Sequence, residues 1–312
     1  MPHLTRVSGY THLGVADLVP PPSEGIFFEP ADTETGAWVG HDLLTPGCGL
    51  LDLGSGSGAA AAAMSRSGAG HVHGIDASAD SVAWADKHHA ADRTGARVTF
   101  ARADFSLLDS LRLLATAPRP LPRPLVVTSN PPYVPMTEEV EAAEGKRSIS
   151  AGADGLRWAP VIIAHARALR CDLGLTIGSY SSPATAVEML RDAGFRIRTV
   201  TLCPLDLGDF TVRHIERTAT LEERGEAVLW RREDEPPAYF ITGLACRWTG
   251  SGRAQTPETP DELTGEGLMD LLRTAARSST PRLETLDDTG ADLWPGAVRV
   301  VDLPTADHRN HW

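Results

Sequence analysis

The sequence lacks long hydrophobic runs. No stretch of its 312 residues approaches the roughly 18 consecutive apolar residues that a membrane-spanning helix needs. Its start also lacks the order of a secretion signal, in which basic residues precede an apolar core and a small-residue cleavage site. We therefore expect a cytoplasmic protein with no membrane segment. With 42% hydrophobic and 22% charged residues, the composition is that of an ordinary globular chain of one or two domains.

Cysteine is scarce as well. The four cysteines lie far apart, no Cys-x-x-Cys pair occurs, and none has a histidine at the spacing of a zinc site. We expect four reduced thiols in or near the core and no bound metal. His71 and His73 alternate on an expected strand, but two ligands do not make a zinc site, so both are expected to be structural.

Clustered positive charge is also missing. The formal net charge of −12 opposes non-specific attraction to nucleic acid, because phosphate binding needs grouped lysines and arginines. The nearest basic groups, residues 119–123 and Arg231-Arg232, are expected to be solvated. An acidic balance is compatible with a cationic small substrate.

The sequence does contain a regular alternation of short apolar runs and helical segments. Such alternation predicts an α/β fold, a doubly wound parallel sheet with helices on both faces. The expected strands are 49–53, 71–75, 98–101, 125–129, 173–178, 196–202 and 239–248, and the expected helices are 35–45, 59–67, 78–91, 159–169, 184–193 and 268–276. The last two strands have no clear crossover between them, so we expect an antiparallel edge pair.

The same pattern divides the chain into three parts. Residues 1–45 form an N-terminal segment that we expect to act as a gate, and residues 46–248 form the central domain. Within that domain, residues 205–238 are an insert with a charged helix expected over 210–232. A connection of that length is usually functional or disordered, and we hypothesise a substrate lid, with a surface excursion or dimer contact as an equal alternative. Residues 249–312 are expected to form a linker and a C-terminal extension.

The first strand runs into a glycine-rich loop. Gly54, Gly56 and Gly58 allow backbone to approach a ligand closely at the carboxyl ends of the strands. The pattern also satisfies a dinucleotide fingerprint, which is weak evidence by itself. Asp52, just before the loop, would repel a pyrophosphate but attract S-adenosylmethionine, whose ammonium and sulfonium groups are cationic. The alternative is that Asp52 orders the loop by accepting hydrogen bonds from backbone N–H groups.

Two further carboxylates follow the next two strands. Asp76 stands 20 residues after Gly56, where an acidic residue accepts hydrogen bonds from ribose hydroxyls, and Ala77 next to it is also expected to bind the cofactor. Asp104 follows the third strand and is assigned to the adenine amino group, with Phe105 against the adenine ring. A turn role for Asp76 and a plain core role for Phe105 are the alternatives.

The run Asn130-Pro131-Pro132-Tyr133 follows the fourth strand. A planar amide, guanidine or aromatic amine nitrogen is a poor nucleophile, because its lone pair is delocalised. The side-chain carbonyl of Asn130 and the backbone carbonyl of Pro131 can accept both hydrogens of such an NH₂ group. The prolines fix the backbone, and Tyr133 can stack on the flat group. An ordinary turn is the alternative, but the run ends a strand at the same sheet edge as Asp52.

These motifs resemble the Asn-Pro-Pro-Tyr class of S-adenosylmethionine-dependent methyltransferases, most nearly the HemK-like glutamine methyltransferases that modify release factors. The matching parts are residues 28–33, 52–58, Asp76, Asp104, 130–133, Glu144 and 151–156. The resemblance covers roughly residues 26–204 and 239–248. It implies a class I methyltransferase fold with an acceptor nitrogen held by Asn130, Pro131 and Tyr133. The residues it places on the cofactor are Thr33, Asp52, Gly54, Gly56, Gly58, Asp76 and Asp104.

The chain also departs from that family. Only about 25 residues precede the match where the bacterial enzymes carry a helical domain, and the shorter relatives lack the insert and the tail. We therefore expect an enzyme that methylates a planar nitrogen of a small molecule or peptide, in specialised metabolism. The alternatives are a release-factor glutamine methyltransferase, then an adenine-N6 methyltransferase acting on nucleic acid, then a fold that only binds a partner. The sequence predicts no oligomeric state.

Overall fold

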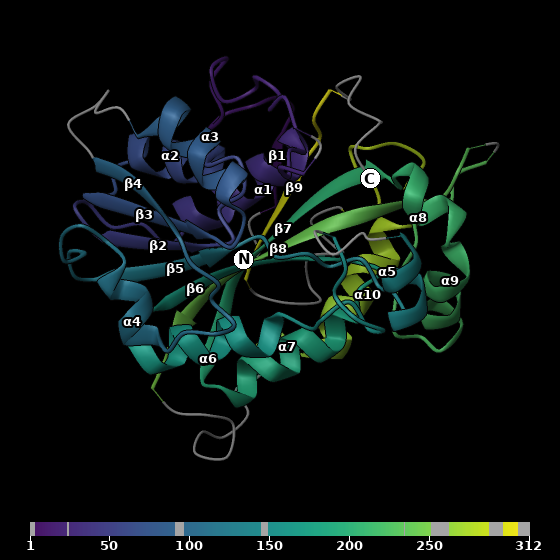
Figure 1. The fold of residues 1–312 in the computed structure, drawn as a ribbon. Helices are drawn as coiled ribbons and strands as arrows, with labels where there is room; N and C mark the ends of the chain where they lie inside the picture. Colours follow the sequence, from purple (N-terminus) through teal and green to yellow (C-terminus); the bar gives the residue numbers. More distant parts are fainter. Residues whose placement is uncertain are drawn as a thin grey trace.

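A mixed β-sheet forms the centre of the computed structural model (Figure 1). The structure describes residues 4–23, 25–90, 97–144, 149–233, 235–250, 262–286 and 296–304. Within these residues the strand order is β1-β9-β7-β8-β6-β5-β2-β3-β4. Helices α1, α2 and α3 cover one face, and α4, α6 and α7 cover the other (Figure 1). The expected doubly wound α/β fold is confirmed.

The parallel part of the sheet agrees with the expected alternation. It consists of β2 (Gly49–Leu53), β3 (His71–Asp76), β4 (Arg97–Arg102), β5 (Leu125–Ser129) and β6 (Asp172–Gly178). The crossover helices are α2 (Ala59–Arg66), α3 (Ala79–His89), α4 (Ser110–Ala115), α6 (Ala159–Leu169) and α7 (Pro183–Asp192). Every residue of β2 and β5 is buried, because helices cover both faces of a parallel sheet. Of these elements, only the short α4 was not predicted.

Helix α1 (Pro30–His41) begins earlier than the expected span of residues 35–45. Pro30 occupies the first turn, where a missing N–H breaks no helical hydrogen bond. The side chain of Glu29 accepts a hydrogen bond from the Ala31 backbone N–H and so caps the helix. The early start brings the first turn of α1 to the carboxyl ends of the strands.

The last two expected strands pair antiparallel, as predicted. These are β7 (Phe195–Asp206) and β8 (Ala238–Trp248), and β8 also runs antiparallel to β6. Strand β8 therefore lies inside the sheet, between β6 and β7. Beyond β7 the sheet continues in two short parallel strands that were not predicted, β9 (Ala297–Val301) and β1 (Leu4–Val7).

The insert contains two short helices in place of the single helix expected over 210–232. They are α8 (Asp209–Arg213) and α9 (Ile215–Glu223). Helix α9 ends before Gly225, whose φ of 72° a helix cannot continue through. The chain then returns to the sheet, where Trp230 pairs with Ala238.

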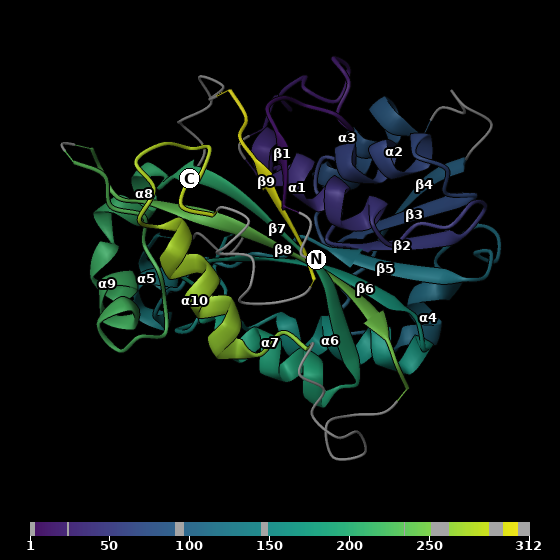
Figure 2. The same ribbon diagram turned by 180° about the vertical axis from the view of Figure 1, so that it is seen from behind.

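Two helices lie outside this core. Helix α5 (Glu138–Glu144) follows the Asn-Pro-Pro-Tyr loop, and α10 (Gly265–Ala275) packs beside α7, as seen from behind in Figure 2. The expected helix near 268–276 is thus confirmed. Most of the expected linker, residues 251–261, lies outside the described residues. In the described part of the chain, no helix combines the length and apolarity needed to cross a membrane.

Candidate functional site

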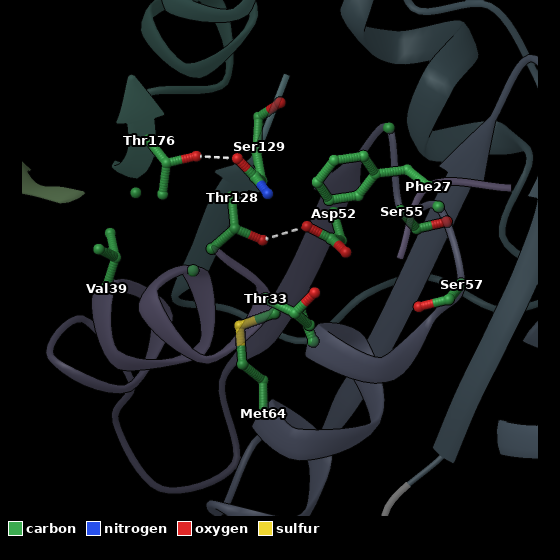
Figure 3. Close-up of a pocket in the computed structure, with 16 residues that line it drawn as sticks. Phe27, Thr33, Val39, Asp52, Ser55, Ser57, Met64, Thr128, Ser129 and Thr176 are labelled. Atoms are coloured by element: carbon green, nitrogen blue, oxygen red, sulfur yellow. Dashed lines mark hydrogen bonds between the residues drawn. The ribbon is translucent and has the colours of Figure 1, made fainter. Parts of the chain in front are cut away.

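A pocket lies where the carboxyl ends of β2 and β5 meet α1 and α2 (Figure 3). It holds about 500 Å³ of space not filled by atoms, counting the part open to solvent. Five of the residues predicted from the sequence line it: Thr33, Asp52, Gly54, Gly56 and Asn130. The structure therefore brings the glycine loop and the first residue of the Asn-Pro-Pro-Tyr run to one place.

The three loop glycines have different roles. All have positive φ angles, 74° at Gly54, 53° at Gly56 and 81° at Gly58. A Cβ atom on Gly58 would lie 2.7 Å from Cβ of Ala85 and 2.8 Å from the ring of Phe100. Gly58 therefore allows α2 to pack against α3 and β4, and it does not line the pocket. Gly54 and Gly56 face the pocket and leave room there.

Asp52 is the only charged side chain among the described residues that line the pocket. Its carboxyl group is 5% exposed and accepts a hydrogen bond of 2.7 Å from Thr128 (Figure 3). Burial, together with the nearby charge of Asp76, raises the pKa of Asp52 to about 6. A pocket with one carboxylate and no lysine or arginine in its described lining suits a cation better than a phosphate.

Asp76 orders the glycine loop, which is the role that we had considered for Asp52. One of its carboxylate oxygens accepts from the Gly56 N–H at 2.9 Å and the other from the Ser78 N–H at 2.8 Å. Burial nevertheless raises its pKa. Asp76 does not itself line the pocket, and neither does Ala77, whose carbonyl accepts from Arg102 at 3.2 Å.

The two residues expected to bind adenine, Asp104 and Phe105, lie outside the pocket lining. The Asp104 carboxylate accepts hydrogen bonds from the backbone N–H and the hydroxyl of Ser106, at 2.9 and 2.6 Å. The Phe105 ring lies next to Gly54, where an added Cβ would approach it to 3.7 Å. It also meets Trp158 edge to face at 5.8 Å, so it has both a core contact and a contact to the loop.

Asn130 presents its amide to the pocket at the end of β5. Thr176 on β6 also lines the pocket, and its hydroxyl donates a hydrogen bond to Oδ1 of Asn130. No feature of the sequence singles out Thr176, because it lies in the middle of an apolar strand. Pro131 is buried and Pro132 is partly exposed, and neither lines the pocket.

Tyr133 is not placed to stack on a ligand in the pocket, as the sequence had suggested. Its side chain is 7% exposed and does not line the pocket. The hydroxyl donates a 2.7 Å hydrogen bond to Oδ2 of Asp32 and lies 3.1 Å from the hydroxyl of Tyr239. The ring therefore packs behind Asn130, in a buried polar cluster.

Two acidic residues near Asn130 were missed as functional candidates. Asp32 is 1% exposed, and burial raises its pKa to about 6. Glu29, the cap of α1, has a pKa raised to about 7 by burial. Both lie in the segment 28–33 that carries the family resemblance, but nothing in the sequence shows that α1 begins at Pro30 and buries them.

The remaining titratable groups give no sign of a metal centre. Within the described residues, no three histidine, cysteine or acidic side chains are grouped as metal ligands. His71 and His73 both hydrogen-bond to the Thr99 hydroxyl, at 3.0 and 2.9 Å. Their expected structural role agrees with this geometry.

Part of the chain matches a known protein family. Residues 50–113 match the model of a family described as a methyltransferase domain. The matched segment runs from β2 through the glycine loop, β3 and β4 to α4. A comparison with curated proteins finds no match. The match indicates that the chain is an enzyme, a methyltransferase with S-adenosylmethionine as its methyl donor.

Several solved structures resemble the fold at low identity. A ribosomal protein L11 methylase from Lactobacillus delbrueckii subsp. bulgaricus shares 15% identity over 72% of this chain and 81% of its own, with a TM-score of 0.38. Magnesium protoporphyrin IX methyltransferase from Synechocystis, solved with bound S-adenosylmethionine, shares 17% over 68% and 77%, with a TM-score of 0.36. Precorrin-6y C5,15-methyltransferase from Geobacter metallireducens shares 15% over 75% and 98%, with a TM-score of 0.42. Such likenesses do not bear on the substrate of this chain.

Proposed function

We propose that the chain transfers a methyl group from S-adenosylmethionine to a planar nitrogen of a small molecule or peptide. The bond from sulfur to the methyl group would break as the bond from nitrogen to that carbon forms, S-adenosylhomocysteine would leave, and the nitrogen would lose one proton to water. One observation carries this proposal: Asn130 lines the same pocket as Asp52 and the glycine loop. An amide at the end of β5 then faces the place where the donor would lie. The order of the motifs supports membership of the Asn-Pro-Pro-Tyr class.

On the donor side, the residues present fit the cationic cofactor. S-Adenosylmethionine supplies, when bound, a methyl group activated by the positive charge of its sulfonium sulfur. Asp52 offers a buried negative charge, and Gly54 and Gly56 let the backbone come close. Asp76 keeps one lone pair on each carboxylate oxygen for ribose hydroxyls, and Asp104 and Phe105 would hold the adenine.

On the acceptor side, Asn130 and Pro131 hold the nitrogen. The carbonyl oxygen of the Asn130 amide accepts from Thr176 and keeps a second lone pair for one hydrogen of the acceptor. The backbone carbonyl of Pro131 would accept the other. When both hydrogens are held by hydrogen bonds, the lone pair of the nitrogen points toward the donor. The rigid prolines keep that geometry in place.

The remaining parts of the chain would control access to this site. Residues 46–248 form the catalytic domain in this proposal, with residues 1–45 as a gate and 249–312 as an extension. Phe27 and Thr33, from the proposed gate, line the pocket. The insert at 205–238 would act as a substrate lid, and Arg217 on α9, which donates to the Ala153 carbonyl at 2.6 Å, would hold it against the loop after Tyr133.

The test is a methyl-transfer assay with separate acceptor pools. The protein is incubated with ¹³C-methyl donor and, in turn, with release factor, nucleic acid and a small-metabolite extract. We expect label in the small-metabolite or peptide pool, and a ¹³C chemical shift typical of a methyl group on nitrogen. Label on carbon or oxygen would refute the nitrogen acceptor, and label only in nucleic acid or release factor would refute the substrate class.

A further inference from the structure

The chain has four tyrosines, and all of them lie near the first turn of α1. Tyr133, Tyr180 and Tyr239 form one buried cluster, with ring centroids 4.6 to 6.3 Å apart. They come from the loop after β5, the end of β6 and the start of β8. Burial raises the pKa of Tyr10, from the N-terminal segment, and the nearby charge of Glu29 adds to the rise. We call Tyr133, Tyr180 and Tyr239 the tyrosine cluster.

A buried carboxyl group stands between the tyrosine cluster and Asn130. Oδ2 of Asp32 accepts the hydrogen bond from Tyr133, whereas Oδ1 is buried and has no hydrogen-bond partner among the described residues. The Asn130 amide adjoins the same carboxyl group and favours its ionised form, without completing a hydrogen bond to Oδ1. A buried acceptor without a donor is costly, so Oδ1 points to a missing N–H partner.

Negative charge near Asp32 also lacks a countercharge. Glu29 lies on the same turn of α1. Both carboxylates add to the rise in pKa that burial causes at Tyr239 and at Cys203. The charges that shift the pKa values of Glu29, Asp32 and the tyrosine cluster come from acidic residues and tyrosines. Among the described residues, no lysine, arginine or histidine shifts these pKa values. Neither Glu29 nor Asp32 forms an ion pair in the described structure. Burying such charge without a partner is unfavourable, so the site is prepared for a cation.

We infer that the acceptor nitrogen belongs to a planar cationic group, an amidine or a guanidine, with Asp32 behind Asn130 as its countercharge. This inference rests on the proposed function and names its substrate class. A neutral carboxamide would satisfy Asn130 and Pro131 equally well but would leave the carboxylate of Asp32 uncompensated.

Benzamidine and benzamide test the inference directly, because they share a shape and differ in charge. Their dissociation constants are measured by calorimetry on the protein saturated with S-adenosylhomocysteine. We expect benzamidine to bind at least tenfold more tightly to the wild-type protein. Asp32→Asn, which can still accept the proton of Tyr133, reduces the preference to within about twofold. Glu223→Gln, which removes one exposed charge at the end of α9, keeps it.

Equal affinities in the wild-type protein, or an unchanged preference in Asp32→Asn, would overturn the inference. If that variant does not fold, the pH dependence of the preference is measured in Asp52→Asn, because Asp52 lines the pocket and also takes up a proton near pH 6. Benzamidine stays charged between pH 8 and 5, while Asp32 and Glu29 take up protons, with pKa values of about 6 and 7. Tyr10, Cys203 and the tyrosine cluster stay neutral there, because burial raises each pKa. The preference is expected to fall at least fivefold, and a constant preference refutes the inference.

The two proposals fail in different ways. A methyl group found on a neutral carboxamide nitrogen would refute the cationic acceptor and leave nitrogen methylation standing. A methyl group found on carbon or oxygen would refute the proposed function itself, whichever of the two probes binds more tightly.

Discussion

The side chains of Asp32, Asp52 and Asp76 are chemically identical, but their surroundings give them different roles. Asp76 uses both oxygens to hold backbone N–H groups, Asp52 accepts from Thr128, and Asp32 accepts from Tyr133. Burial raises the pKa of all three. The sequence predicted Asp52 and Asp76, because each follows a strand that periodicity locates. It gave no role to Asp32, because burial in the first turn of a helix depends on tertiary packing.

Replacement of Asp76 should weaken donor binding more than it weakens the fold. Asp76→Ala removes the acceptor of the Gly56 N–H and the expected partner of the ribose. We expect the dissociation constant for S-adenosylmethionine to rise about tenfold or more, which is roughly 1.4 kcal/mol. Calorimetry gives the value, with exposed Asp86→Ala on α3 as the control. An unchanged constant would remove Asp76 from the donor site.

Replacement of Asp32 should stabilise the protein at high pH. The folded-state pKa of about 6 lies above the ordinary value of 3.8, so the folded chain loses stability as pH rises through 6 and this side chain ionises. A shift of that size corresponds to at most about 3 kcal/mol. Asp32→Asn removes this cost. Urea unfolding without S-adenosylmethionine should therefore show that the substitution raises the free energy of unfolding more at pH 8 than at pH 5. If Asp32→Asn lowered the free energy of unfolding equally at both pH values, the assigned cost of burying this carboxylate would be wrong.

Among the elements, strands β2 to β8 and most crossover helices were predictable, whereas the start of α1 and the break in the insert were not. The alternation fixed β2 to β6 to within one residue at each end. The start of α1 was missed because Pro30 and the cap Glu29 give a weaker signal than hydrophobic periodicity. The insert was expected as one helix because its charged pattern continues past Gly225, whose positive φ ends α9.

Within the glycine loop, Gly58 is expected to be needed for packing. Gly58→Ala places a Cβ 2.7 Å from that of Ala85, whereas Gly68→Ala has nothing within 4 Å. Both positions have positive φ, 81° and 110°, so the backbone strain is similar in kind. We expect Gly58→Ala to lower the free energy of unfolding by about 1 to 3 kcal/mol more than Gly68→Ala. If urea unfolding showed the same loss of unfolding free energy for both variants, the close contact with Ala85 on α3 would not be the reason for glycine at position 58.

The insert is expected to hold the loop that follows Tyr133. Arg217→Ala removes the hydrogen bond to Ala153, a contribution of about 1 kcal/mol. Amide exchange in residues 149–155 should therefore become roughly fivefold faster, while exchange in β2 stays unchanged. Exposed Arg224→Ala, just after α9, is the matched control. Unchanged exchange in Arg217→Ala would favour a surface excursion over a lid.

At the scale of the whole molecule, the sheet joins distant parts of the chain around one acidic site. Strands β1 and β9 pair with each other and extend the sheet beyond β7. They were not predicted because strands of four and five residues give little periodic signal. The net charge of −12 predicted a preference for cations, and the structure concentrates part of that charge in buried carboxylates at Asp32 and Asp52. Which carboxylates are buried together follows from the fold and not from composition.

The central claim is that Asn130 serves the acceptor and not the donor. Single-turnover methyl transfer and donor affinity are measured side by side for wild type and Asn130→Ala. We expect methyl transfer to slow at least roughly 100-fold, because the acceptor nitrogen loses its side-chain hydrogen-bond partner, and the dissociation constant of S-adenosylmethionine to stay within about twofold. Equal losses of transfer and donor affinity, or transfer at the wild-type rate, would contradict the account.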